Sequence, residues 1–379
     1  MTRTIIDINI LQTVPPSNLN RDDTGSPKTA VYGGARRARV SSQAWKRATR
    51  LGFEERLDQT DLGMRTKRLV EEVARRARRL EGELSEEDAI RAATAVLEAA
   101  GVKLKAPRVK KGEAAGPGES EFLFFLSSSQ LDRIARLAVD AERSEDPKAA
   151  LKAAAPKKIL AEDHSIDIAL FGRMVANLTD LNVDAAAQVA HALSVHAVDE
   201  EFDYFTAVDD AKDSTAGDDA GAAMIGTVAY NSSTLYRYAT VNAERLLANL
   251  GDAQATRRAI EAFVQSFAAS MPSGKQNTFA NRTLPDAIVV TLRDSQSVNL
   301  VGAFEEPVVG DARLRRAAEA LAEHATEVDA NFGTTPMKSW VVRVGAATEA
   351  LDVLGERVTF PELADAVGEA VAERLMAAR

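Results

Sequence analysis

The sequence predicts an α+β protein in which a sheet and its helices are interrupted by a long helical insertion. Three observations support this prediction. The chain begins with the alternation of a strand, residues 61–190 carry helical spacings rich in Ala, Glu and Arg, and strand and helix patterns return beyond residue 229. At 379 residues with 45% hydrophobic content, the chain is long enough for two or three domains.

The first segment has the period-2 pattern of a half-buried strand. Ile6, Ile8 and Ile10 fall on one face, and Asp7 and Asn9 fall on the other. We expect this strand to end at the two prolines that follow. The same polar residues interrupt the apolar run, so it predicts neither a signal peptide nor a membrane span.

The string VSSQAWKRATRL predicts a helix with Ser41 or Ser42 as its N-cap. Helical spacing puts a polar stripe on one side and an apolar stripe on the other; the polar stripe is Gln43, Lys46, Arg47 and Arg50, and the apolar stripe is Ala44, Trp45, Ala48 and Leu51. The helix should therefore dock by its apolar side and expose a basic ridge.

The overall charge of −9 is unevenly distributed. No acidic residue occurs between Thr24 and Phe53, where seven basic side chains are found: Lys28, Arg36, Arg37, Arg39, Lys46, Arg47 and Arg50. A local basic patch on an acidic protein is typical of a phosphate-binding surface. The alternative is a solvated charged face with no ligand.

The helical insertion carries Leu69, Val73, Ala77 and Leu80 at spacings of three and four. Within it, residues 105–119 have the Pro, Gly and charge content of an exposed, mobile loop. Residues 209–226 are small, polar and acidic, and a loop of that length is usually functional or disordered.

The last third predicts two helices and a buried strand. One helical stripe consists of Ile260, Phe263, Val264, Phe267 and Met271, and the string AIVVTL (287–292) predicts the strand. Pro361 suits a first helical turn, and it precedes an amphipathic stripe of Leu363, Val367, Val371 and Leu375.

Residues for catalysis or metal binding are not assembled in any recognisable pattern, so we expect no enzyme, cofactor or metal. There is no cysteine, and the closest pair of histidines is five residues apart rather than four. SGKQ (273–276) lacks the first glycine and the final Ser or Thr of a phosphate-binding loop. Asp209 and Asp210 adjoin each other, but neighbouring acids in a polar loop more often keep it solvated than hold magnesium.

The predicted elements suit an RNA-recognition-type sheet, a module that binds single-stranded RNA. These elements are a strand, a capped basic helix, and a later helix and strand that flank an exposed Lys275.

Six strings, in order along the chain, resemble CasC, the repeated backbone subunit of the type I-E CRISPR surveillance complex Cascade. They are LNRDD (19–23), GGARRARVSSQAWKRATR (33–50), DIALFGRM (167–174), AHALSVHAVDEEFDYFTAVDD (190–210), LYRYATVNAERLLANLG (235–251) and PSGKQNTFA (272–280). Residues 300–379 carry no recognised string.

The resemblance implies a modified RNA-recognition-motif (ferredoxin-like) palm at 1–60 and 229–379, a helical fingers insertion at 61–190 and a thumb loop at 197–228. It also implies a non-catalytic protein, and the absence of cysteine fits a reducing cytoplasm. Its partners would be CRISPR RNA, target DNA through the guide, other Cascade subunits and copies of itself in a helical filament. Each copy would grip the guide backbone and displace one base at regular intervals.

The resemblance also implies roles for individual residues. Phosphate and ribose contacts are expected from Arg21, Lys28, Ser41, Gln43, Lys46 and Arg50, and Arg37 of the basic run joins this RNA-binding set. Met174 would wedge beside the displaced nucleotide, with core packing as the alternative. Phe205 and Thr206 would support the kink, and Lys275 and Gln276 would lie near the guide. Trp45 departs from the family, where a smaller aliphatic residue is expected.

Two other functions stay open. Relatives in type III complexes cut target RNA with a thumb-region Asp, a role that Asp209 or Asp210 could fill. A self-standing RNA-binding module would instead bind short single strands as a monomer, without the steep length dependence of a filament.

Overall fold

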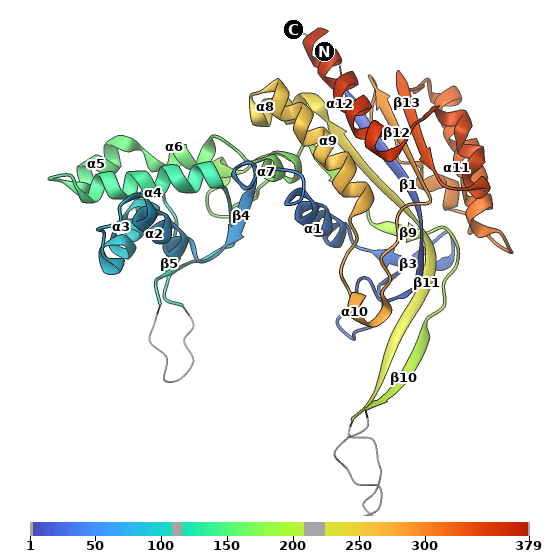
Figure 1. Cartoon of the computed structure of the whole chain (residues 1–379), viewed down its shortest axis with the longest axis horizontal. Coiled ribbons are helices and arrows are strands. Elements are labelled where there is room, and N and C mark those ends of the chain that lie inside the picture. The colour runs from blue at the N-terminus through green and yellow to red at the C-terminus, as the bar shows by residue number, and fades with distance from the viewer. Residues whose placement is uncertain (1–2, 108–115, 208–223, 378–379) are drawn as a thin grey trace, which may run out of the picture. The chain divides into compact units, whose positions relative to one another are not determined.

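The fold is described from a computed structural model for residues 3–107, 116–207 and 224–377. The chain forms two compact units (Figure 1). The first unit comprises Met1–Gly52, Val189–Thr240 and Phe263–Arg379, and the second comprises Phe53–Gln188 and Val241–Ala262. The second unit therefore enters the sequence of the first as two insertions. Residues 241–262, which the sequence assigned to the second part of the palm, lie in the second unit.

A large mixed sheet forms the centre of the first unit. Its strand order is β14-β13-β12-β1-β11-β9-β3-β2. The strands are β1 (Ile5–Ser17), β2 (Thr29–Tyr32), β3 (Ala35–Val40), β9 (Ala192–Ser194), β11 (Met224–Asn242), β12 (Ala287–Arg293), β13 (Lys338–Arg343) and β14 (Glu356–Arg357). β1 pairs antiparallel with β12, and β13 pairs parallel with β14. β8 (Ala187–Val189) lies where the chain passes between the units.

β1 is buried on both faces, contrary to the half-buried prediction. Ile6, Ile8 and Ile10 are fully buried as expected, but Asp7 and Asn9 are also 0% and 1% exposed. Helix α11 (Arg313–Phe332) and the short helices η3 (Leu300–Phe304) and η4 (Ala346–Leu354) cover the face that includes Leu11. The strand also continues through the two prolines to Ser17.

Both patterns predicted near the C-terminus are confirmed. The predicted strand is β12, of which every residue is buried. The predicted last helix is α12 (Phe360–Ala377), and its apolar stripe is buried where the helix packs on β12 and β13. Helix α9 (Ala253–Ala269) likewise buries the predicted stripe from Ile260 to Phe267, but it ends before the last predicted member, Met271, which is half-buried.

A long two-stranded ribbon replaces part of the predicted thumb loop. β10 (Glu201–Ala207) pairs antiparallel with the first part of β11, from Tyr230 back to Met224 (Figure 1). Residues 208–223, which include Asp209, Asp210 and most of the predicted acidic loop, lie outside the described residues.

The second unit is a helical bundle with two small ribbons. Its helices are α2 (Leu69–Leu80), α3 (Glu86–Ala99), α4 (Ser128–Glu142), α5 (Pro147–Ala154), α6 (Pro156–Ala161), α7 (Ile166–Phe171) and α8 (Ala243–Leu250), with η1 (Gln59–Asp61) and η2 (Thr179–Leu181). The ribbons pair β4 (Gly63–Thr66) with β7 (Phe124–Ser127), and β5 (Leu104–Lys105) with β6 (Glu119–Ser120). Residues 108–115 of the predicted exposed loop lie outside the described residues.

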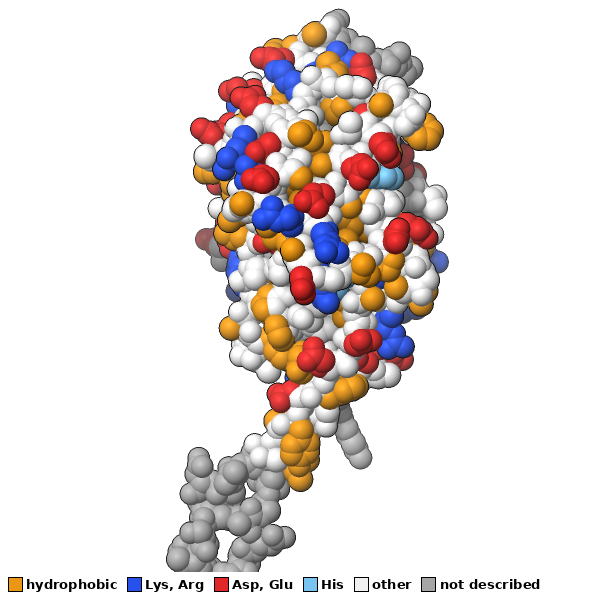
Figure 2. Space-filling view, turned by 90° about the vertical axis from the view of Figure 1, so that its right-hand side faces the viewer, with side chains coloured by type: hydrophobic (Ala, Val, Ile, Leu, Met, Phe, Trp, Pro, Cys, Tyr) orange, Lys and Arg blue, Asp and Glu red, His pale blue; other side chains and the backbone are white. Residues whose placement is uncertain are grey.

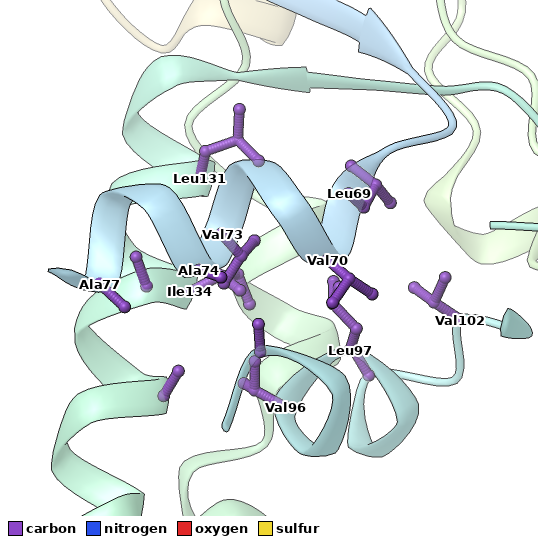
Figure 3. Close-up of a cluster of buried hydrophobic side chains, with 14 of the residues drawn as sticks. Leu69, Val70, Val73, Ala74, Ala77, Val96, Leu97, Val102, Leu131 and Ile134 are labelled. Carbon is purple, nitrogen blue, oxygen red and sulfur yellow. The ribbon is translucent and has the colours of Figure 1, made fainter. Parts of the chain in front are cut away.

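The core of this unit lies between α2, α3 and α4. Figure 3 shows side chains of α2, including Val70 and Val73, directed toward Val96 and Leu97 of α3 and Ile134 of α4. The predicted α2 stripe is buried except at its last member, Leu80, which is 48% exposed at the end of the helix. Within the part of the chain that the structure describes, no helix is both long and apolar enough to span a bilayer.

Candidate nucleic-acid interface

The predicted basic helix is α1 (Ser42–Phe53), and Ser41 is its N-cap, with the Ala44 N–H donating to Ser41 Oγ at 3.3 Å. Trp45 and Ala48 are buried as predicted. Leu51 is 40% exposed and Thr49 is fully buried instead, because the Thr49 hydroxyl donates to the Trp45 carbonyl and needs no water. Gln43 and Arg47 are exposed, and Lys46 and Arg50 are half-buried. The helix therefore presents its basic ridge largely as expected.

A buried arginine holds α1 on the sheet. The Arg237 guanidinium lies 3.7 Å from the centroid of the Trp45 ring and 4.7 Å from that of Phe267. It also donates to Gln12 Oε1 at 2.6 Å, and its burial lowers the pKa of Arg237 to about 9. Desolvated cation–π contacts of this kind contribute about 2 kcal/mol. Trp45 thus stacks on the buried guanidinium of Arg237 and faces away from the ridge.

The loop before β2 is ordered by Asn20 and Asp22. The Asn20 carbonyl accepts from the Lys28 N–H at 2.8 Å, and its side-chain Oδ1 accepts from the Ser41 N–H at 2.9 Å. Asp22 Oδ1 accepts from the Thr24 hydroxyl at 2.7 Å and the Ser26 N–H at 3.1 Å, and the Thr24 hydroxyl is the main reason that the pKa of Asp22 is lowered.

Asn20 thereby joins three predicted contact residues. Arg21 follows Asn20 in the chain and is exposed, and its backbone forms an isolated antiparallel β-bridge with Pro27, the neighbour of Lys28. Ser41 lies on its other side, at the start of α1. One asparagine therefore brings the loop cations to the N-terminus of the basic helix.

The loop that carries Lys275 packs against the same region. A Cβ added at Gly274 would lie 2.2 Å from the Leu19 carbonyl oxygen, so only glycine permits this approach. Lys275 has a left-handed backbone, with φ of 50°, and is half-buried, while Gln276 begins the short helix α10 (Gln276–Phe279) and is exposed. The structure therefore brings Lys275 and Gln276 beside the Arg21 loop.

Arg37 corrects one prediction. It is 0% exposed, and its guanidinium donates to the carbonyls of Ser194 at 3.0 Å and Phe304 at 2.9 Å. The nearby Tyr32 and Glu305 carbonyls accept from it as well. Its charge and donors are used inside the protein, so Arg37 is not part of the exposed set.

His191 is an exposed residue beside this surface that the sequence reasoning missed, and it lies near Arg39 of the basic run. His191 Nδ1 accepts from the Ser42 N–H at 3.2 Å. Burial, and then the charges of Arg39 and Lys28, lower the pKa of His191. This imidazole therefore stays neutral near neutral pH at the start of α1. No sequence signal joins His191 to Ser42, which is 149 positions away.

The predicted thumb residues lie on the β10–β11 ribbon. Phe205 stands opposite Gly226, and its ring lies where a Cβ at Gly226 would fall, 2.4 Å away. This ring therefore covers the glycine and is 36% exposed. Thr206 is exposed, and so are Phe202 and Tyr204, at 63% and 62%.

Met174 lies in the second unit and is 83% exposed. Its neighbours Arg173 and Val175 are buried. This exposure excludes core packing, the alternative that the sequence left open for Met174.

Charge elsewhere on the first unit is mixed. Figure 2 shows acidic and basic side chains interspersed over the face that carries α11, in contrast to the acid-free segment of α1. Among the residues described, no group of three or more His, Asp or Glu side chains could hold a metal ion.

These features define a mixed α+β protein with a large sheet, an inserted helical unit and a basic helix on its surface. The model of the family described as CT1975-like protein matches residues 6–366, and the chain belongs to this family. A chain of the solved structure titled "CRISPR RNA-guided surveillance complex, pre-nicking" is similar to it, with 36% identity, a TM-score of 0.85 and coverage of 97% of this chain and 100% of that chain. A chain of a "CRISPR RNA-guided surveillance complex" matches with 32% identity, a TM-score of 0.74 and coverage of 97% and 99%. The comparison with curated proteins finds no match.

Proposed function

We propose that this chain is the CRISPR RNA-binding backbone subunit of a type I-E Cascade complex, corresponding to CasC. The observation that carries the proposal is the clustering around Asn20, which joins the loop of Arg21 and Lys28 to the N-terminus of α1. Backbone N–H groups, hydroxyls and cations at such a point suit phosphate oxygens. The titles of the similar solved structures, which are RNA-guided complexes, support the same function.

In this proposal the first unit is the RNA-recognition-type palm, the second unit is the fingers, and the β10–β11 ribbon is the thumb. Arg21, Lys28, Ser41, Gln43, Lys46, Arg50, Lys275 and Gln276 contact the guide backbone. Phe205 and Thr206 support the kink, and Met174 wedges beside the displaced base.

The proposed mechanism is passive, without catalysis by this subunit. Copies polymerise along one guide in the cytoplasm, with other Cascade subunits at its ends or sides, and hold the guide extended. Target DNA then pairs without the full entropic cost of ordering the RNA, and base pairing supplies the sequence specificity.

The test is native mass spectrometry of the protein expressed with a CRISPR array and its processing partners, followed by sequencing of bound RNA. Several copies on one repeat-spacer RNA are expected. A monomer without RNA would contradict the proposal, and metal-dependent cleavage of complementary RNA at regular spacing would replace it with the type III-like function.

The double variant Lys46→Ala/Arg50→Ala should weaken RNA binding and lower the salt dependence. Each phosphate contact removed reduces the slope of log K against log salt by about 0.7 for a single strand, so the expected change is about 1.4. Filter binding over a range of salt concentrations measures it. The matched control is Arg315→Ala/Lys338→Ala, which removes one Arg and one Lys from other exposed sites of the first unit. An unchanged slope in Lys46→Ala/Arg50→Ala would exclude both residues from the interface.

A further inference from the structure

Met174 combines an exposed side chain with a firmly held backbone. On one side, the Arg173 N–H donates to the Val183 carbonyl at 3.0 Å, and the Val183 N–H donates back to the Arg173 carbonyl at 2.8 Å. On the other side, the Val175 N–H donates to Asn182 Oδ1 at 2.6 Å. The peptide groups flanking Met174 are therefore bound to one short segment, residues 182–183.

Gly172 adds to this frame. Its φ is +76°, and a Cβ would lie 2.8 Å from the Val183 carbonyl oxygen and 3.0 Å from the Ala185 nitrogen. The chain turns there in a conformation that other residues rarely adopt, against main-chain atoms that leave no room. The backbone on the N-terminal side of Met174 is therefore fixed.

The Arg173 side chain extends in the opposite sense, into the second unit. It is 5% exposed and donates from Nε to the Leu181 carbonyl at 2.8 Å, from Nη2 to the Leu160 carbonyl at 2.7 Å and from Nη1 to the Phe125 carbonyl at 3.2 Å. These acceptors belong to η2, α6 and β7, so one guanidinium joins three elements at the base of the Met174 turn.

Arginine suits this position because its planar fork can donate in several directions at once. A lysine ammonium at the same place would concentrate its donors at one point and could not reach all three carbonyls. The contact to Leu181 is the most informative, because that residue immediately precedes Asn182. Arg173 therefore anchors Leu181, and the next residue, Asn182, accepts the hydrogen bond from the Val175 N–H.

We propose that Arg173 and Asn182 are positioning residues that fix the height and direction of the Met174 side chain, so that this apolar group meets the displaced nucleotide of the guide. The proposal rests on the proposed function, in which Met174 is the wedge. Neither residue needs to touch RNA. A fixed backbone sets the position and direction of the Met174 Cα–Cβ bond, so the thioether samples only the region that its staggered rotamers reach from there.

The experiment assembles the full-length protein on synthetic single-stranded RNAs, each carrying 2-aminopurine at one position. This base fluoresces more strongly when it is unstacked. The unsubstituted protein should give bright positions at regular intervals, and Met174→Ala should lose that periodicity. Asn182→Ala should reduce the contrast between bright and dim positions by at least about half, while RNA affinity changes less than about 2-fold because no phosphate contact is removed.

Asn182→Asp is the matched control, because its carboxylate still accepts from the Val175 N–H and should restore the contrast. Arg173→Lys should lower the contrast while retaining the charge, and thermal melting shows whether each variant folds. If Arg173→Lys does not fold, the comparison of Asn182→Ala with Asn182→Asp tests the positioning role. Periodic brightness that Met174→Ala removes but folded Asn182→Ala and Arg173→Lys retain would overturn the positioning roles alone. No periodicity, or no effect of Met174→Ala, would overturn the wedge and the positioning roles together.

Discussion

The interior of the first unit and the exposed face of α1 both carry charged residues, but they use them differently. Inside the sheet, Arg37, Arg237 and Arg293 are at most 1% exposed, and each donates to carbonyls or carboxylates of the protein. On α1, Arg47 is exposed, and no acidic residue lies between Thr24 and Phe53. The comparison teaches that an arginine in a basic run can be used inside the fold, as Arg37 is, or remain exposed, as Arg47 does, and that only the exposed one is available to a ligand.

The buried ion pair of β1 should give the largest effect on stability. Asp7 is 0% exposed and accepts from the Tyr238 hydroxyl at 2.7 Å, the Val298 N–H at 2.9 Å and Arg293 Nε at 3.2 Å. Asp7→Ala leaves the Arg293 charge buried with less compensation, which typically costs about 3–5 kcal/mol. We expect the lower end, because Asp329 still accepts from Arg293 at 2.7 Å.

Urea unfolding monitored by circular dichroism measures this loss. The control is Asp23→Ala, at an exposed position of the same unit, which should change the free energy of unfolding by less than about 0.5 kcal/mol. Equal losses of unfolding free energy in Asp7→Ala and Asp23→Ala would mean that the buried carboxylate stabilises the fold no more than the exposed one.

The burial of Asp7 also shows where sequence reasoning ends. Alternation in β1 and the helical stripes of α9 and α12 are local patterns, and the structure confirms the strand and both helices. The second cover of β1 is α11, which begins some 300 positions later at Arg313, so nothing near Asp7 indicates that its face is covered. Local periodicity predicts which residues share a face, but only tertiary packing determines whether that face meets water.

The same limit applies to the candidate interface. The spacing of α1 correctly predicted the burial of Trp45, while the charge run wrongly included Arg37, whose acceptors at Ser194 and Phe304 are distant in sequence. The exposure of Met174 could not be predicted from its residue type, because an apolar side chain suits a core equally well, and only the family resemblance implied it. The roles in RNA binding stay predictions.

The half-buried His164 should make the free energy of unfolding depend on pH. Burial, and then the charge of Arg173, lower the pKa of His164 to about 4, against the opposing effect of Asp163. In the unfolded chain the imidazole titrates near 6.5. The unfolded state therefore binds more protons between these values, so stability is highest above pH 6.5 and is lost as pH falls toward about 4.

Urea unfolding at several pH values between 4 and 7 measures this effect. His164→Gln should unfold with a shallower pH dependence than the unsubstituted chain. The pKa values of His191 and His196 are also lowered, so the His164 contribution is the difference between the two curves. Parallel curves would show that His164 is protonated as easily in the folded protein as in the unfolded chain.

Substitution of Ser41 should give the smallest effect on stability. This residue belongs to both groups, because it caps α1 and is also a predicted RNA contact. Ser41→Ala removes the acceptor of the Ala44 N–H and should cost about 1 kcal/mol. Ser41→Asp keeps a good N-cap, since carboxylates accept well at helix N-termini, and should preserve the free energy of unfolding. The added negative charge should nevertheless repel phosphate and weaken RNA binding. Urea unfolding and filter binding on both variants separate the two roles. If Ser41→Asp binds RNA like the unsubstituted protein, Ser41 serves the helix alone, and the part of the interface on α1 begins at Gln43.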